Sequence, residues 1–314
     1  MKLTCAVVIA THNRKEDLRR TFLALEALRP QACEVIVCAD GCSDGTPEFV
    51  RTNHPGCRLI VNERARGSIA SRDRMIRESS GDIVLSLDDD SYPLEADFFE
   101  VVSEFFSRNP RLAVATFPQR SDEFPESLSA VDFGPAAFTG SYTSSGAAIR
   151  RSAFLELGGY PVHFRHAYEE PDFALRAVNA GCQVKFETAL TVRHHYTKAQ
   201  RNELRTHQFH ARNELWSVVM RCPAPQLFAV AGFRAFRQFG YAWKRGASWI
   251  LREPLWWAAF LAGLPRCLAE RKPVPWRRYR SWMELLRRPI TSEEEWLKKF
   301  GPRESVERGK RDNP

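Results

Sequence analysis

The sequence predicts an α/β fold in which a mostly parallel β-sheet carries helices on both faces. Short apolar runs recur along the first 117 residues, and amphipathic segments with helical spacing separate them. The runs are nearly continuous in Val, Ile, Leu and Ala, which is typical of strands buried on both faces. An alternation of strands and helices of this kind favours a parallel sheet with crossover helices.

Each element is predicted from its local pattern. Residues 3–10 form the first buried strand, and residues 15–28 place Leu18, Phe22, Leu25 and Leu28 on one helix face. The next predicted strands are 34–39, 58–61, 82–87 and 112–117, and the next predicted helices are 47–53, 68–79 and 97–108. The expected sheet is Rossmann-like, and ligands of such sheets bind beyond the carboxyl ends of the strands.

The pattern loosens after residue 118. Residues 119–145 are rich in Pro, Gly, Ser and aromatic residues, which indicates a long functional loop or a small excursion. The later predicted elements are helices at 152–157, 172–180 and 199–220, strands at 183–186 and 190–192, and amphipathic helices within 226–269 that break at Pro254 and Pro265. Asp172 is expected to cap its helix at the N-terminus.

Charge divides the chain unevenly. Residues 216–314 hold 20 Lys/Arg and 9 Asp/Glu, so they carry +11, and about −3 remains for residues 1–215 of a chain with net charge +8. We therefore predict a first domain at 1–215, a basic and aromatic-rich helical region at 216–300, and a disordered tail at 301–314. The interleaved Trp, Phe and Arg of the helical region fit three roles: an anionic membrane surface, plain packing or oligomerisation, or nucleic acid. No nucleic-acid motif is present, so nucleic acid is the least favoured.

Cysteine usage and targeting signals predict a reducing compartment. The eight cysteines form no Cys-x-x-Cys pair and no zinc spacing, and we expect free thiols. No signal peptide and no long uncharged apolar stretch are seen, so a cytoplasmic protein is expected, peripheral on the inner membrane face if the basic region binds lipid.

Three adjacent carboxylates, Asp88, Asp89 and Asp90, follow the fourth predicted strand without a spacer. Alternation along the chain sends Asp88 and Asp90 to one side. Two carboxylates at a sheet edge suit Mg²⁺ or Mn²⁺, and an exposed acidic turn is the alternative.

Five segments in order resemble the family 2 glycosyltransferases, over roughly residues 3–215. They are VVIATHNR, VCADGCSDGT, the stretch from Asn62 to Asp73, GDIVLSLDDDSYP, and GGYPVHFRHAYEEPDFALRAVNAG. The resemblance implies a GT-A-type catalytic domain that takes a sugar from a nucleotide-diphosphate donor with the help of a metal ion. Asp73 stands where this family usually has Asn.

The resemblance also implies roles for single residues. Thr11 and Asp40 would contact the nucleobase and ribose of the donor, although Asp40 alone also fits a turn-capping role. Arg72 would face the diphosphate, or be a surface helix arginine. Asn13, Arg14 and Asp89 leave strand ends at the same edge and complete the predicted donor site, beside a metal held by Asp88 and Asp90.

The predicted base is Glu170, and Glu169 is the fallback. A direct displacement at the anomeric carbon needs a carboxylate to take the proton of the acceptor hydroxyl, and it inverts the configuration. The family usually has Asp at the position of Glu170. Acids favoured by a helix start are the structural alternative.

The roles of two further pairs of adjacent residues are left open by the sequence. His194 and His195 follow a predicted strand, and either one would complete the metal shell, or both are surface residues. Arg212-Asn213 resembles a recurring pair of the family, with a phosphate or acceptor contact as the expected role. A membrane surface at 216–300 would imply a lipid-linked hydroxyl acceptor and a part in cell-surface glycan or glycolipid assembly.

The rival functions are a nucleotidyltransferase and a catalytically silent relative that binds membrane or protein. The first usually needs a Gly-rich loop after the first strand, and THNRKED is not Gly-rich. The second is disfavoured because the acidic residues at 88–90 and 169–172 are all present.

Overall fold

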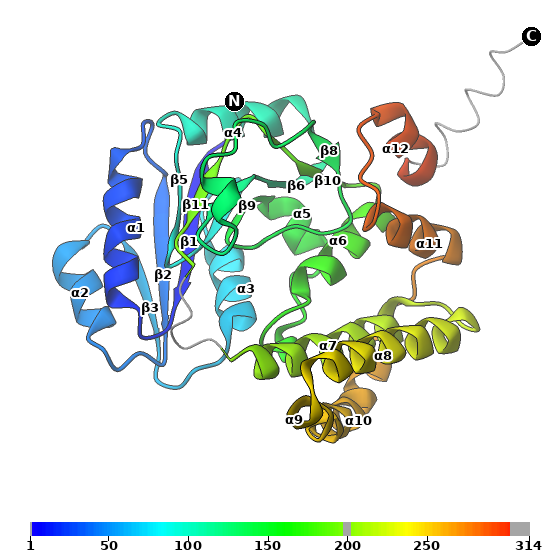
Figure 1. Cartoon of the computed structure of the whole chain (residues 1–314). Helices are drawn as coiled ribbons and strands as arrows, with labels where there is room; N and C mark the ends of the chain where they lie inside the picture. Colours follow the sequence, from blue (N-terminus) through cyan, green and yellow to red (C-terminus); the bar gives the residue numbers. More distant parts are fainter. Residues whose placement is uncertain (1, 197–201, 302–314) are drawn as a thin grey trace, which may run out of the picture.

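The computed structural model describes residues 2–196 and 202–301, and it contains the predicted α/β fold (Figure 1). An eight-stranded sheet has the order β3-β2-β1-β4-β9-β6-β10-β8. Its strands are β1 (Cys5–Thr11), β2 (Glu34–Asp40), β3 (Arg58–Asn62), β4 (Ile83–Asp88), β6 (Leu112–Thr116), β8 (Ala137–Phe138), β9 (Gly146–Arg150) and β10 (Gln183–Phe186). Strands β1 to β4 are mutually parallel, as the alternation of apolar runs predicted.

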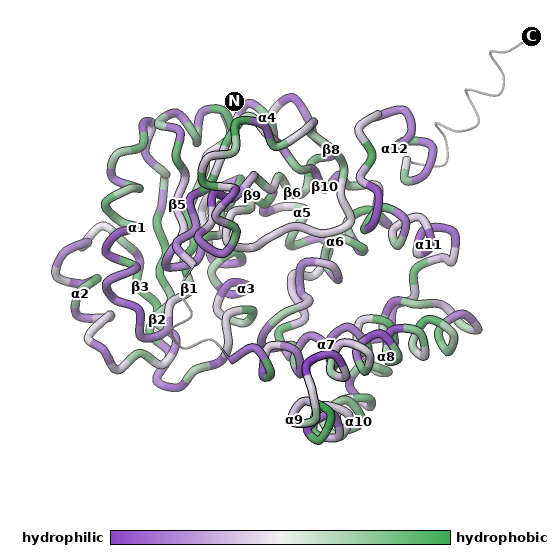
Figure 2. Tube along the Cα trace, in the orientation of Figure 1, coloured by the Kyte–Doolittle hydropathy of each residue, from purple (hydrophilic) through white to green (hydrophobic). Residues whose placement is uncertain are grey.

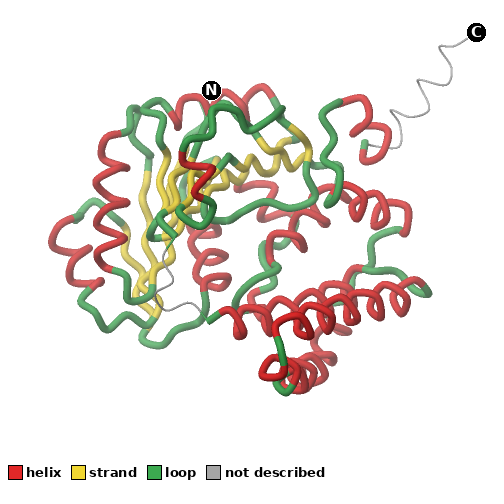
Figure 3. The backbone as a smooth tube through the Cα atoms, in the orientation of Figure 1, coloured by secondary structure: helices red, strands yellow, loops and turns green. Residues whose placement is uncertain are grey.

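Helices cover both faces of the large sheet (Figures 1 and 3). One face packs against α1 (Lys15–Ala27), α2 (Thr46–Asn53) and α4 (Phe98–Arg108), and the other against α3 (Ser68–Glu78), α5 (Arg151–Glu156) and α6 (Glu169–Asn179). Alternate residues of one strand serve the two faces: Val7 and Ile9 lie in the first core, and Val8 lies in the second.

Strand β9 was not predicted. It runs antiparallel between β4 and β6, and its residues Gly146–Arg150 fall between the predicted loop at 119–145 and the predicted helix at 152–157. The predicted loop at 119–145 contains β7 (Gln119–Ser121), a 3-10 turn η1 (Pro125–Leu128) and β8. Strand β9 is too short to be predicted from its sequence, because five residues with a central Ala-Ala do not give a pattern that distinguishes a strand from a loop.

A second sheet of three strands holds part of the site. Strand β11 (Val192–His194) pairs antiparallel with β5 (Ser91–Pro93) and parallel with β7. This places His194 opposite Ser91, directly after the aspartates of β4.

The C-terminal helices continue the core of the first domain. They are α7 (Glu203–Arg221), α8 (Gln226–Arg245), α9 (Ala247–Ile250), α10 (Glu253–Ala269), α11 (Trp276–Leu285) and α12 (Glu293–Phe300). The predicted domain boundary at 215/216 falls inside α7, and one buried cluster joins residues of α3 and α6 to residues of α7, α10 and α12. Of the predicted tail, Gly301 is buried, and residues 302–314 lie outside the described residues.

One of the two predicted helix breaks needs correction. Pro265 lies inside α10 and does not break it, because Trp256, Phe260 and Cys267 are buried on both sides of the proline, and this packing outweighs the lost hydrogen bond. Pro254 fits its prediction, since it stands in the first turn of α10.

Candidate functional site

The three aspartates lie in a tight turn between β4 and β5. Ser91 fixes this turn, because its hydroxyl accepts from the Asp88 backbone N–H at 2.8 Å and donates to the Asp88 carbonyl at 3.3 Å. Strand β4 lies beside β1 in the sheet, so the carboxylates leave the sheet at the edge where residues 11–14 also emerge. The predicted convergence of these strand ends is therefore present.

Arg14 neutralises part of this negative charge. Its guanidinium lies 2.8 Å from Asp89 Oδ1 and 2.6 Å from Asp90 Oδ2. Burial raises the pKa of Asp89 to about 7, and the charges of Asp90 and Asp88 add to the shift against the attraction of Arg14. Asp90 is also buried, yet His194 and Arg14 hold its pKa below the ordinary value.

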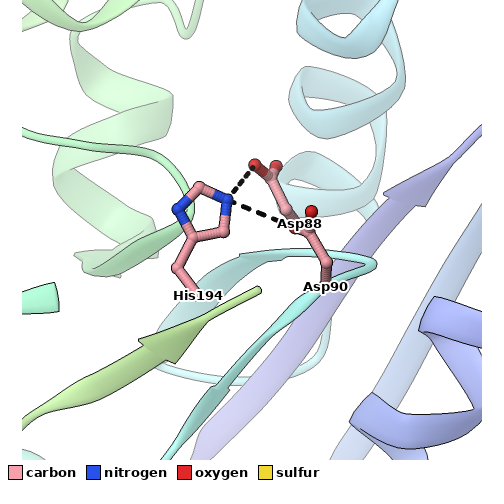
Figure 4. A group of neighbouring side chains, drawn as sticks. All are labelled: Asp88, Asp90 and His194. Carbon is pink, nitrogen blue, oxygen red and sulfur yellow. Dashed lines mark ion pairs between the residues drawn. The ribbon is translucent and has the colours of Figure 1, made fainter. Parts of the chain in front are cut away.

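Asp88, Asp90 and His194 form a group that could hold a metal ion (Figure 4). One ligand atom of each lies within 4.8 Å of the others. The imidazole Nε2 is 3.3 Å from Asp90 Oδ1 and 3.9 Å from Asp88 Oδ2. The other ring nitrogen, Nδ1, lies 3.2 Å from Gln119 Oε1, so a proton at Nδ1 leaves the lone pair of Nε2 facing the carboxylates. Two carboxylates and one imidazole are a suitable ligand set for Mn²⁺ or Mg²⁺.

The two predicted histidines separate in the structure. His195 is not in the group around Asp88, because its ring points to other partners. Its Nε2 lies 2.9 Å from the Tyr92 hydroxyl, and its Nδ1 lies 3.6 Å from Asp122. Its backbone N–H donates to the Asp90 carbonyl at 2.8 Å. His195 therefore helps to hold the turn, and of the two histidines only His194 remains a candidate metal ligand.

Arg72 joins the acidic turn to the glutamate pair. It rises from α3, is buried, and forms an ion pair with Asp88. Burial opposes its charge, but Asp88, Glu169 and Glu170 outweigh this and raise the pKa of the guanidinium. The alternative of a surface helix arginine is wrong, since only 6% of Arg72 is exposed.

Glu169 and Glu170 begin α6. The helix starts at Glu169 and not at Asp172, because Tyr168 in the left-handed region ends the preceding loop. Glu169 is buried, and its pKa lies well above the ordinary value because of that burial and the adjacent Glu170 charge. Glu170 is partly exposed, and its Oε1 accepts from the Ser144 backbone N–H at 3.4 Å.

The loop before this pair is strained and is held by Asn213 of α7. Arg165, Ala167 and Tyr168 have φ values of 65°, 66° and 73°, a region that non-glycine residues rarely adopt. The Asn213 amide donates to the carbonyls of residues 164, 166 and 167 at 3.1, 2.7 and 2.8 Å. Arg212 donates to the carbonyl of residue 164 at 2.9 Å. The pair Arg212-Asn213 thus fixes the loop that aims the glutamates, and its predicted contact with a ligand stays a prediction.

Asp172 is a buried charge of α6 and does not cap the helix as expected. Its carboxylate receives Arg176 Nε at 2.9 Å, Arg221 Nε at 3.0 Å and Ser217 Oγ at 2.9 Å. Asp172→Ala should lower the free energy of unfolding by roughly 3–5 kcal/mol, because Arg221 would keep a buried charge without its partner. Urea unfolding measures this loss. Glu104→Ala breaks the exposed pair with Arg108 and should cost less than about 1 kcal/mol, so equal effects of the two changes would contradict the role of Asp172.

The remaining predicted donor residues lie around β1 and β2. Asp40 accepts from the backbone N–H groups of Arg66 and Gly67 at 2.9 and 2.8 Å and from Asn62 Nδ2 at 2.7 Å. It therefore fixes the turn before α3 while it still lines the cavity. Asn13 accepts from the Ser43 N–H at 2.7 Å and ties two strand ends together. Thr11 is buried behind the wall, whose lining includes its neighbours Ala10 and His12.

One cavity of about 740 Å³ brings most of these residues together. Arg14, Asp40, Arg72, Asp88, Asp89, Glu169 and Glu170 all line it. A volume of this size suits a small-molecule ligand. Sequence reasoning missed several lining residues: Ser144 of the loop 141–145, Arg165 of the loop before α6, and Arg205, Phe209 and His210 of α7. The only signal for α7 was the spacing of Arg205 and Phe209, which puts both on one helix face.

Comparison with known protein families finds proteins that this chain resembles. Residues 6–158 match the family described as glycosyl transferase family 2. The "Pre-mycofactocin glycosyltransferase" of Mycobacterium tuberculosis is 27% identical over 203 residues, which are 60% of this chain and 42% of that protein. The chain thus spans less than half the length of this curated relative.

Two solved structures share the fold. S. aureus TarS 1–349, in complex with UDP-GlcNAc, has a TM-score of 0.60 at 15% identity, over 98% of this chain and 92% of that one. The mannosyltransferase PcManGT from Pyrobaculum calidifontis, in complex with GDP-Man and Mn²⁺, has a TM-score of 0.55 at 19% identity, over 91% of this chain and 85% of that one. These similarities confirm the predicted GT-A-type α/β fold.

Proposed function

We propose that this chain is a family 2 glycosyltransferase, which moves a sugar from a nucleoside diphosphate donor to a hydroxyl group and inverts the anomeric configuration. The family match over residues 6–158 and the name of the relative support glycosyltransferase activity. The observation that carries the proposal is the single cavity lined by both the aspartate turn and the glutamate pair. In this proposal the donor would bind at the aspartate turn, next to a carboxylate that acts on the acceptor.

The donor half of the site consists of Asp88, Asp90 and His194, with Arg72 beside them. These three residues would hold Mg²⁺ or Mn²⁺, which supplies positive charge for the diphosphate of the leaving group. Arg72 adds a fixed guanidinium for the phosphate oxygens. Arg14 keeps Asp89 and Asp90 in place through an ion pair with each of them. Asp40 and the turn 62–67 would meet the nucleoside, since they line the same cavity.

Glu170 is the proposed base. It is partly exposed in the cavity, whereas Glu169 is buried and its raised pKa favours the protonated carboxyl. A protonated carboxyl cannot take a proton, so Glu169 is better suited to donate a hydrogen bond. In the proposed reaction Glu170 removes the acceptor proton as the hydroxyl oxygen bonds to the anomeric carbon and the bond to the diphosphate breaks.

The test of this function is release of nucleoside diphosphate from candidate donors, with Mn²⁺ and with EDTA. Release that needs both the divalent ion and one particular donor supports a glycosyltransferase. A nucleotidyltransferase would instead release inorganic diphosphate when a nucleoside triphosphate and a sugar phosphate are supplied, and a silent relative would release neither product.

A membrane surface is the proposed site of the reaction. None of the described helices is long and apolar enough to span a bilayer. Among the described residues, eleven of the nineteen exposed large hydrophobic side chains nevertheless lie between Phe228 and Leu268, within the segment from α8 to α10, whose hydrophobic stretches are visible in Figure 2. Glu253 is the only acidic residue between 222 and 269, and it is buried against His207 at 3.0 Å. An exposed surface of aromatic and basic side chains without carboxylates suits an anionic lipid surface.

Vesicle binding checks this surface. The double change Phe236→Ser and Trp243→Ser removes side chains that are 74% and 65% exposed, and it should lower binding to phosphatidylglycerol vesicles by more than about tenfold. Sedimentation with the vesicles measures the bound fraction. Leu23→Ser on α1, at a residue 64% exposed, should leave binding unchanged. A dimer in solution that the double change disrupts, without any vesicle binding, would show instead that this face joins two copies.

A further inference from the structure

Three arginines meet at one end of the cavity. Arg165 and Arg205 line the cavity itself, and Arg205 and Arg212 line a smaller pocket of about 200 Å³ that adjoins it. Arg165 belongs to the strained loop before the glutamate pair. Arg205 and Arg212 are two turns apart on α7, so they point from the same side of that helix.

The charge of this arginine cluster is not balanced by carboxylates. Within residues 2–196 and 202–301 neither Arg165, Arg205 nor Arg212 forms an ion pair with an acidic side chain. Arg212 donates instead to the neutral carbonyl of Phe164 and to Asn213 Oδ1, at 2.9 Å each. Burial and the repulsion of Arg165 lower the pKa of Arg212 to about 10. Arg165 lines the cavity, Arg212 lines the adjoining pocket and Arg205 lines both. Three guanidinium groups around this junction attract an anion.

Apart from Arg205, Arg212 and Gln208, the residues that form the wall of the smaller pocket are apolar. Phe209 of α7 stacks with Arg205 and Arg212, at 5.6 and 4.8 Å from ring centroid to guanidinium carbon. Leu255, Trp256 and Ala259 of α10 complete the wall. Leu255 is 62% exposed, so the pocket continues onto the exposed apolar surface of α10. The pocket therefore offers positive charge toward the cavity and hydrocarbon contacts toward the outside.

We propose that this pocket binds the acceptor, and that the acceptor is an amphiphile whose head carries an anionic phosphate and the hydroxyl group that receives the sugar. Arg165, Arg205 and Arg212 bind the phosphate, and the hydrocarbon chain lies along Phe209, Leu255 and Trp256. The inference rests on the proposed function, because the head reaches Glu170 through the same cavity. A free phosphate ester would use the arginines alone, whereas a lipid would use the arginines and the apolar residues.

Calorimetric titration with decyl phosphate, inorganic phosphate and the neutral decyl glucoside separates these cases, with each amphiphile kept below its micelle concentration. Decyl phosphate should bind the wild-type protein at least about tenfold more tightly than either other probe. Inorganic phosphate can contact only the arginines, and decyl glucoside can contact only the apolar residues. Equal affinity for inorganic phosphate would overturn the lipid acceptor, and equal affinity for decyl glucoside would overturn the anion site.

Substitutions localise the binding. Arg205→Gln should weaken the binding of decyl phosphate by about tenfold or more, because it removes one charge-assisted contact. Arg205 is exposed, so its substitution should not destabilise the fold. Lys244→Gln on α8 removes an exposed charge outside the pocket and should leave the affinity unchanged. Equal losses for both variants would show binding through general charge and overturn the site.

Donor binding is measured separately, as the thermal shift of the wild-type protein with Mn²⁺ and nucleoside diphosphates. If the protein binds decyl phosphate through Arg205 but shows no such shift, the proposal of this pocket stands and the proposed enzymatic function is refuted. If the protein shows the shift but binds no decyl phosphate, the proposed enzymatic function stands and the amphiphilic acceptor is refuted.

Discussion

Asp90→Asn is expected to lower the rate of nucleoside diphosphate release by about 10³-fold. The substitution keeps the shape of the side chain but removes a buried negative charge that faces His194 Nε2 at 3.3 Å. An amide is a poor ligand for a hard divalent cation next to the remaining carboxylate. Coupled detection of the released nucleotide, at saturating donor and Mn²⁺, measures the loss.

A matched substitution separates this effect from instability. Asp90 also binds Arg14, so thermal unfolding of the variant must be recorded beside the rate. Asp122→Asn removes an exposed carboxylate near His195 on the same small sheet, and it should change the rate less than about twofold. A folded Asp90→Asn protein with the wild-type rate and unchanged dependence on Mn²⁺ would refute the metal site.

Glu170→Gln is expected to reduce the rate by about 10²- to 10⁴-fold, the range that general-base catalysis contributes. Glutamine keeps the contact with the Ser144 N–H, which the Glu170 carboxylate accepts at 3.4 Å, but it cannot take a proton. Binding of donor and metal, measured by thermal shift, should be retained because Glu170 lies outside the Asp88–His194 group. The expected result is therefore a loss of turnover without a loss of donor affinity.

Glu169→Gln is the comparison that assigns the base. Burial and the Glu170 charge raise the pKa of Glu169 well above its ordinary value, so its protonated form, which glutamine imitates, predominates up to higher pH than for an ordinary glutamate. The loss in rate should consequently be smaller than for Glu170→Gln. The reverse order of the two losses would assign the base to Glu169.

Local patterns were sufficient to predict the first half of the fold. Strands β1, β2 and β4 are largely buried apolar runs, and the edge strand β3 is partly exposed. Amphipathic helices lie between them, and the structure places the ends of these elements within one or two residues of prediction. Buried runs are decided by the immediate sequence because such a strand must be apolar along its whole length. The aspartate turn was predictable for the same reason, since it directly follows β4.

Contacts between distant segments were not predictable in this way. Arg14 pairs with carboxylates more than 70 residues away, and the Asn213 amide holds carbonyls 46 to 49 residues earlier in the chain. The start of α6 at Glu169 depends on that strained loop and not on local capping signals. The different partners of His194 and His195 depend on the pairing of β11 with β5 and β7, and the sequence of a three-residue strand does not predict this pairing.

Thermal unfolding with Mn²⁺ and a set of nucleoside diphosphates tests the central claim most directly. A ligand at 100 times its dissociation constant stabilises the native state by about 2.7 kcal/mol, so a true donor nucleotide should raise the unfolding temperature clearly. The account predicts a shift that needs Mn²⁺ and the nucleotide together and that disappears in Asp90→Asn. A shift of the same size in EDTA, or in Asp90→Asn, would contradict a metal-held diphosphate at this site.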